Sequence, residues 1–159
     1  MELLEELESE HGPLTERVSR LQAVFAAVAA GQRQVSTVQG ELRVHFEWLC
    51  HELLDHFGRE EECVFPYLRH ALPMVRGEVE RLESSHDQIC GALSRMQYLT
   101  ARSGRRFEEG FEHLVHVFER FAETYALHAS GEREVLRDAA ARLTPEQRLE
   151  LAETATSVG

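Results

Sequence analysis

The sequence contains no lysine, so its positive charge comes from arginine alone. The chain has 17 basic and 28 acidic residues, which gives a net charge of −11. Because nucleic acids and anionic membrane surfaces would repel such a chain, neither is expected as a partner. Small molecules and metal cations remain open as ligands.

Cysteine is scarce and shows no paired motif. The three cysteines, Cys50, Cys63 and Cys90, are odd in number and include no CxxC pair. This pattern fits neither a disulfide framework nor a thiolate zinc site, so we expect reduced and mostly buried thiols. The first residues, "MELLEELESEH", are acidic where a secretory signal needs a basic start,. We therefore expect a cytoplasmic protein.

Glycine and proline are also few, at 10 and 4 residues. No segment alternates apolar and polar residues between turn signals, whereas the long segments repeat apolar residues at every third or fourth position. These patterns predict an all-α protein. A chain of 159 residues is long enough for one domain around a single core,.

The first half of the chain predicts two long helices. The first covers residues 4–28 and closes at Gly31, with a kink or a restart at Pro13,. The second begins at Ser36, with Gln39 as its capping partner,. It should loosen near Gly58 and be broken by Pro66,.

The second half predicts two more long helices and a short one. Pro73 begins a helix that reaches residue 96, "ARSGRR" turns the chain, and residues 114–139 form the next helix,. Thr144 caps a short fifth helix, with Gln147 as its partner,. Short connections predict an up-down-up-down four-helix bundle over residues 1–143, followed by a short C-terminal helix and tail over 144–159.

Each long helix carries one histidine on its otherwise apolar face: His11, His56, His86 and His128. Counted from a turn centred near Arg33, His11 lies 22 residues before it and His56 lies 23 after it. Counted from Leu72, His56 lies 16 residues before it and His86 lies 14 after it. The last pair gives a poorer match, 18 and 24 residues from Gly104, which requires a later turn or a bulge. The spacing nevertheless predicts one histidine layer across the bundle.

Two of these histidines are followed one turn later by a glutamate on the same face, as His56 with Glu60 and His128 with Glu132,. Buried carboxylates must be paired with a cation or bound to a metal. Imidazoles together with carboxylates that can bridge favour iron or manganese over calcium or structural zinc.

The order of a histidine, "HFGREE" with a following proline, "SSHDQI" and "HASGE" resembles the hemerythrin-like, or HHE cation-binding, family over about residues 8–136. The likeness is greatest to the small stand-alone actinobacterial members. It implies two non-haem iron ions joined by carboxylate and by oxo or hydroxo bridges. The implied ligands are His11 and His56 on one iron, His86 and His128 on the other, and Glu60 and Glu132 as bridges.

The sequence departs from this family's pattern at two positions. Cys90 stands where oxygen carriers have a further histidine, and Phe57 stands where iron-sensing relatives have a glutamate. The second iron therefore lacks a ligand, and Tyr125, three residues before His128, could supply a phenolate as both metal ligand and catalytic group. The alternatives are a Cys90 thiolate, or a core tyrosine that needs only a hydrogen-bond partner.

A ferritin-like di-iron bundle is the structural rival, because "ESEH" and "ESSH" end at His11 and His86,. That arrangement leaves His56 and His128 unexplained, and the chain lacks the long crossover it requires. Glu61 and Glu62 are expected to be solvated or to contact a ligand from outside. The remaining histidines should be surface or packing residues: His45, His51, His70, His113 and His116.

The resemblance implies a redox function in defence against oxidative or nitrosative stress. We expect an oxidoreductase, catalase-like or nitric oxide peroxidase-like, whose ligand is hydrogen peroxide or a small diatomic molecule. A phenolate would stabilise ferric iron and so disfavour an oxygen carrier. The alternative is reversible dioxygen binding or iron and oxygen sensing.

Overall fold

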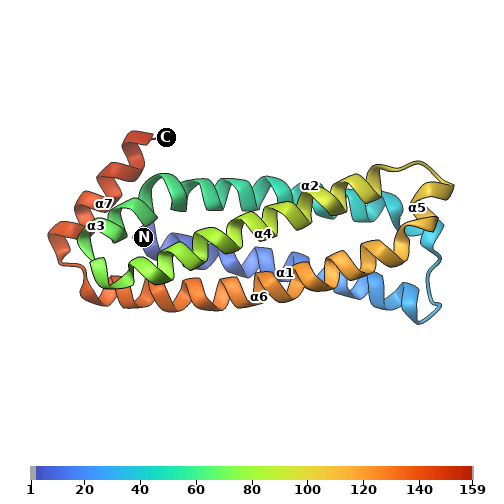
Figure 1. The fold of residues 1–159 in the computed structure, drawn as a ribbon, viewed down its shortest axis with the longest axis horizontal. Coiled ribbons are helices and arrows are strands. Elements are labelled where there is room, and N and C mark those ends of the chain that lie inside the picture. Colours follow the sequence, from blue (N-terminus) through green and yellow to red (C-terminus); the bar gives the residue numbers. More distant parts are fainter. Residues whose placement is uncertain (1–2, 159) are drawn as a thin grey trace.

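A computed structural model describes residues 3–158, and these residues contain helices and turns but no strand. Four long helices lie side by side and successive ones run in opposite directions (Figure 1). Each of them contacts the helix before and the helix after it, and the last contacts the first. They are α1 (Leu3–Ala29), α2 (Val35–Arg59), α4 (Arg76–Ala101) and α6 (Phe111–Arg142). The prediction of an all-helical protein is confirmed.

Shorter helical segments join or follow the long ones. The sequence predicted the last of them but neither α3 nor α5. They are a π-helical turn (Glu60–Val64), α3 (Phe65–Ala71), a 3-10 turn (Pro73–Val75), α5 (Arg105–Glu109) and α7 (Pro145–Val158). Among the described helices, none is long and apolar enough to cross a membrane.

The first helix does not restart at Pro13, which lies inside one continuous α1. The prediction of a restart is therefore wrong. Buried Leu7 and Leu14 flank the proline on the same inward face, and their packing holds both halves of the helix against the core. The helix ends as expected, because Gly31 takes a positive φ of 73° that other residues rarely adopt,.

The predicted capping box at the start of α2 is also wrong. The helix begins at Val35, and no side chain caps it. Gln39 instead donates hydrogen bonds to the backbone oxygens of Thr100 and Arg102, at 2.8 and 2.6 Å. These carbonyls lie at the end of α4, where helical carbonyls lack partners within the helix. Gln39 therefore ties two helices together.

Pro66 does not break the chain's helical course as predicted. The backbone widens before it into the π-helical turn, in which the Phe65 N–H bonds to the oxygen of Glu60, five residues back. Pro66 then occupies the first turn of α3, where a missing N–H costs little,. Single π-turns inside helices often occur at functional sites, and this one begins at Glu60.

The short helix α5 explains why the last pair of histidines matched poorly in the sequence. The connection between α4 and α6 runs from Ala101 to Phe111, so its centre lies near residue 106. His86 and His128 then lie 20 and 22 residues from that centre. The turn sits later than Gly104, which was one of the two explanations that the sequence left open.

The C-terminal helix α7 packs back onto the π-helical turn at the end of the bundle where α3 lies (Figure 1). Its predicted capping box is present, with bonds of 3.0 and 3.2 Å between Thr144 and Gln147. Leu151 is 1 % exposed within the neighbouring core. The Tyr67 hydroxyl donates to Glu150 at 2.8 Å and links α3 to α7.

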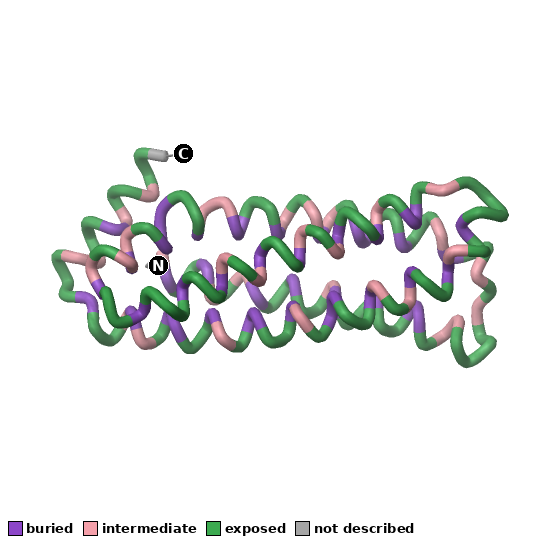
Figure 2. Tube along the Cα trace, in the orientation of Figure 1, coloured by how far each residue is buried: buried purple, intermediate pink, exposed green. Residues whose placement is uncertain are grey.

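Buried residues line the inward sides of the long helices (Figure 2). They form two apolar clusters with a polar layer between them. Along α1, Leu7 belongs to the smaller cluster and Leu14 to the larger, with buried His11 between them. Along α4, Leu82 and Ile89 flank His86 in the same way. The polar layer is therefore enclosed by hydrocarbon on both sides.

Candidate metal centre

Six buried polar side chains meet in this layer. They are the four histidines and two glutamates that the sequence placed there: His11, His56, His86, His128, Glu60 and Glu132. Glu60 and Glu132 are 0 % exposed. The ligand atoms form two groups, one containing His11 and His56 and the other His86 and His128. Within each group all candidate atoms lie within 4.8 Å of one another.

Each glutamate divides its two oxygens between the histidine pairs. Glu60 places Oε1 3.0 Å from His56 Nε2 and Oε2 3.0 Å from His86 Nε2. Glu132 places Oε1 2.9 Å from His11 Nε2 and Oε2 2.9 Å from His128 Nε2. The two carboxylates thus span the gap between the pairs in parallel.

Three of the histidines form a hydrogen bond through Nδ1, on the side of the ring away from the shared glutamates. His56 bonds to Glu10 Oε2 at 2.7 Å, His86 to Glu61 Oε1 at 2.8 Å, and His128 to Ser85 Oγ at 2.5 Å. The Ser85 hydroxyl donates to the Leu82 oxygen at 2.8 Å, so it accepts from His128. Carboxylates accept only, and each Nδ1 therefore carries the proton. For neutral rings, the Nε2 lone pair then faces inward.

Glu10 is itself paired with Arg59, which lies on the flank of α2. Although burial opposes the effect, hydrogen bonds from His56 and Arg59 hold the pKa of Glu10 below its usual value. His11 differs from the other three, because its Nδ1 has no hydrogen-bond partner among the described residues.

Protons balance the charge of this layer in the metal-free protein. Burial lowers the pKa of His56, but the neighbouring carboxylates of Glu10, Glu132 and Glu60 outweigh it and raise the pKa to about 12. Burial and neighbouring Glu132 raise the pKa of Glu60 well above its usual value. Burial also acts to raise the pKa of Glu132, but the neighbouring Glu60, His11 and His128 side chains hold it well below its usual value. Burial lowers the pKa of His86 to about 3, which keeps that imidazole neutral.

The donor set fits a metal cation. Several converging atoms make no hydrogen bond of good geometry with any described residue: both Glu60 oxygens, Glu132 Oε2, His86 Nε2 and His128 Nε2. Buried polar atoms without partners are costly, and a bound cation would satisfy all of them. Imidazole nitrogens with carboxylate oxygens are a donor set that suits iron or manganese.

Comparison with known protein families decides the relationship. The hemerythrin HHE cation binding domain matches residues 2–140, which is most of the chain. The chain belongs to the hemerythrin HHE cation-binding family. Searches of curated proteins and of solved structures gave no match. Hemerythrin domains bind metal cations, usually iron, and the buried histidine and glutamate groups of this domain can hold metal.

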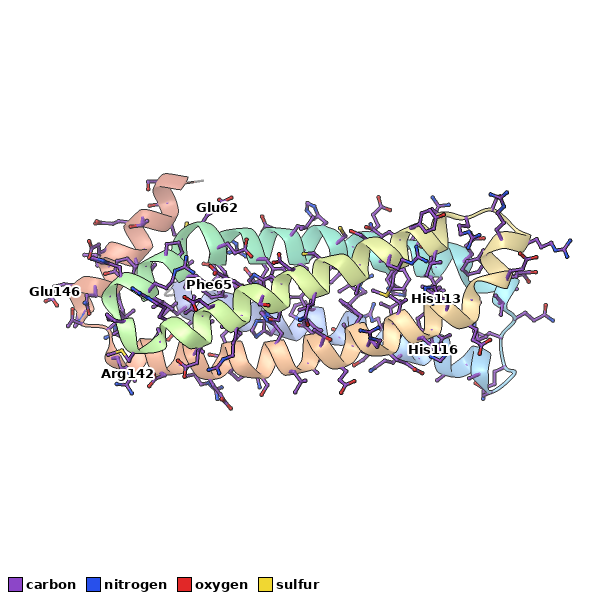
Figure 3. All side chains as sticks on the ribbon, viewed as in Figure 1. Glu62, Phe65, His113, His116, Arg142 and Glu146 are labelled. Atoms are coloured by element: carbon purple, nitrogen blue, oxygen red, sulfur yellow. The ribbon has the colours of Figure 1, made fainter. Side chains whose placement is uncertain are left out.

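Aromatic rings form one wall of this hemerythrin-type centre. Phe57 stacks on His86 with ring centroids 3.7 Å apart, and Phe65 stacks on it at 5.6 Å. Figure 3 shows Phe65 on the inner side of the bundle and Glu62 on the outside of the π-helical turn. Position 57 thus carries a phenyl ring and no carboxylate, and His86 beside it is 2 % exposed.

Tyr125 is 3 % exposed and lies one turn before His128 on α6. Burial raises the pKa of its phenol, with the Thr15 side chain acting in the opposite direction. Its hydroxyl makes no hydrogen bond of good geometry with any described residue. A role as metal ligand and a role as core tyrosine therefore both stay predictions for Tyr125.

Cys90 is half-buried and packs against the larger apolar cluster. Burial raises the pKa of its thiol, which disfavours a thiolate,. It does not belong to either ligand group found among the described residues. The three cysteines are free, and of these Cys63 is buried.

The glutamates of the ferritin-like alternative lie outside the layer. Glu8 pairs with Arg137 at 2.8 Å, and Glu83 pairs with Arg69 at 2.6 Å. The remaining histidines are also elsewhere: His45 is buried beside Arg17, while His51, His70, His113 and His116 are exposed. Figure 3 shows His113 and His116 on α6, toward the end of the bundle away from α7.

Sequence reasoning missed Glu10, Ser85 and Arg59 as supporting residues. Glu10 and Ser85 each directly precede a predicted ligand on its helix, so they lie on the flank rather than on the apolar stripe. Their signal is adjacency to a histidine, which is too common to be diagnostic by itself. Glu61 was placed among the solvated or outer residues, and it contacts His86 from outside.

Proposed function

We propose that this hemerythrin domain holds a pair of iron ions. His11 and His56 would hold one ion, His86 and His128 the other, and Glu60 and Glu132 would bridge them. The observation that carries this proposal is the division of each carboxylate between the two histidine pairs, at 2.9 to 3.0 Å. Bound iron would supply the change between ferrous and ferric states that peroxide or nitric oxide chemistry requires.

Tyr125 is the proposed additional ligand and catalytic group, at the iron beside His128. Its hydroxyl is buried and makes no hydrogen bond of good geometry with the described residues, which supports this role. Because burial raises the pKa of the phenol, the phenolate would form only next to a cation,. An anionic donor favours the ferric state, which supports turnover of an oxidant over reversible dioxygen carriage.

The other residues hold the ligands in place and keep the site dry. Glu10, Glu61 and Ser85 accept the Nδ1 protons and so fix which nitrogen of each ring faces inward,. Phe57 and Phe65 cover His86 and exclude water from that side. Buried Glu60 can hold a proton in the metal-free state, because its pKa is raised.

The function that this arrangement supports best is an oxidoreductase acting on hydrogen peroxide or nitric oxide. We also propose that residues 1–143 form the iron-binding unit and residues 144–159 an added helix and tail; the family match over residues 2–140 supports this division.

Aerobic turnover assays test the proposal. Iron-loaded protein is mixed with hydrogen peroxide or with nitric oxide, and consumption is followed beside the iron-free protein and a Glu132→Ala variant. Consumption of at least one substrate by the iron-loaded protein alone is expected. Reversible dioxygen uptake without consumption of either substrate would contradict the proposal and favour the carrier alternative.

A further inference from the structure

A pocket of about 260 Å³ opens between α1 and α6 and reaches Tyr125. Polar side chains from both helices line it together with alanines and a valine. The polar ones are Thr15, Ser19, Gln22, Ser130 and Arg133. A concave site with an apolar floor and a few polar groups is typical of small-molecule binding. Arg133 is exposed, and its guanidinium lies 3.8 Å from the carboxylate of Glu8.

The inner end of this pocket holds the phenol of Tyr125, which interacts with the Thr15 side chain on the opposite helix. Tyr125 is 3 % exposed, and its hydroxyl makes no hydrogen bond of good geometry with the described residues. Tyr125 lies one turn before His128 on α6, and the charges of His56 and Glu132 act on its phenol, so the inner end of the pocket points toward the candidate centre.

A larger groove of about 670 Å³ between α4 and α6 reaches His128 itself. There the approach to the centre is closed. His128 Nδ1 is hydrogen-bonded to Ser85 Oγ at 2.5 Å, and His128 Nε2 faces Glu132 on the other side of the ring. A molecule in this groove would meet the back of the imidazole.

We propose that the pocket between α1 and α6 is the entrance by which hydrogen peroxide, a small hydrogen-bonding oxidant, reaches the metal centre past Tyr125. The identity of the oxidant rests on the proposed function, whereas the route does not. Hydroxyl groups on the walls can form hydrogen bonds with peroxide and with small anions such as azide,. Azide therefore serves as a probe of the route.

The test measures azide binding to the ferric protein by stopped-flow absorbance. Ser19→Trp on α1 and Ala126→Trp on α6 narrow the pocket from opposite walls, and both positions are exposed. The azide on-rate and off-rate should fall together by at least about tenfold while Kd stays unchanged, because a narrowed route slows passage in both directions. The kcat/KM for peroxide should fall in the same variants.

Leu127→Trp is the matched control. Leu127 is the next residue on α6, is 69 % exposed, and lines the other groove. It should exchange azide at the wild-type rate. Iron content and helical circular dichroism show that each variant is folded and loaded, and the two blocking variants are independent of each other.

Wild-type azide rates in both blocking variants would overturn the proposal, as would slow exchange in Leu127→Trp alone. A changed Kd with unequal effects on the two rates would also overturn it, because the substitution would then act on the iron rather than on the route. A protein whose azide kinetics follow the expected pattern but which consumes no peroxide would contradict the proposed function and still support the entrance.

Discussion

Glu60 and Glu62 lie two residues apart in the same π-helical turn, yet only Glu60 faces the centre. Glu60→Ala should reduce the iron content and lower the melting temperature. The change leaves His56 and His86 without the carboxylate between them, and breaking a buried pair costs about 3–5 kcal/mol. Glu62→Ala is the matched control and should change neither value. Metal analysis and thermal unfolding of both variants check this, and wild-type iron content in Glu60→Ala would reject the bridging role.

Tyr125 carries a spectroscopic prediction. A phenolate on ferric iron gives a visible charge-transfer band, which histidine and carboxylate ligands alone do not give. The oxidised wild-type protein should show that band, and Tyr125→Phe should abolish it while keeping most of the iron, since the other ligands remain. Absorbance and iron content are measured on the same samples. If the variant keeps both the visible spectrum and the activity, the tyrosine is only a packing residue.

At the residue scale, the layer itself could be predicted because helical spacing places His56 with Glu60 and His128 with Glu132 on one face. The supporting residues could not. Whether Glu10 reaches His56 depends on the rotation of α1 against α2, and a single helix pattern does not determine that rotation.

Among the elements, α7 supports the π-helical turn that carries Glu60. Leu151→Ala should lower the free energy of unfolding by about 2–5 kcal/mol, because it removes a buried side chain from the cluster that includes Val64,. Leu149→Ala, two residues away and 63 % exposed, should change it by less than about 0.5 kcal/mol,. Urea unfolding of the two variants compares them, and equal midpoints would show that α7 does not stabilise the bundle.

The errors at this scale have identifiable physical causes. Ser36 and Gln39 have the spacing of a capping box, but Gln39 bonds instead to carbonyls of α4, a partner that is distant in sequence. A proline normally ends a helix, but the π-helical turn before Pro66 places this proline in the first turn of α3, where no N–H is needed. The first outcome depends on a tertiary contact, which local propensity does not contain.

For the whole molecule, the metal-free protein should take up iron with release of protons. The pKa of His56 is raised from 6.5 to about 12, so this ring is charged at neutral pH in the absence of metal. The contribution of protonated His56 to the stability of the metal-free fold is full below pH 6.5 and is lost as pH rises toward about 12,.

Iron must displace the proton of His56, and the affinity for iron should therefore rise with pH. Ferrous titration in weak buffer with an indicator dye measures the release, and pH-independent affinity without proton release would contradict this account.

The whole arrangement also predicts a stoichiometry. Two histidine pairs joined by shared carboxylates should hold about two iron ions per chain, as expected for a di-iron carboxylate bundle,. Metal analysis of protein purified from iron-replete cells, set against its protein concentration, tests this most directly. We predict about two irons per chain and little zinc. One zinc ion per chain, or no bound metal, would contradict the di-iron centre.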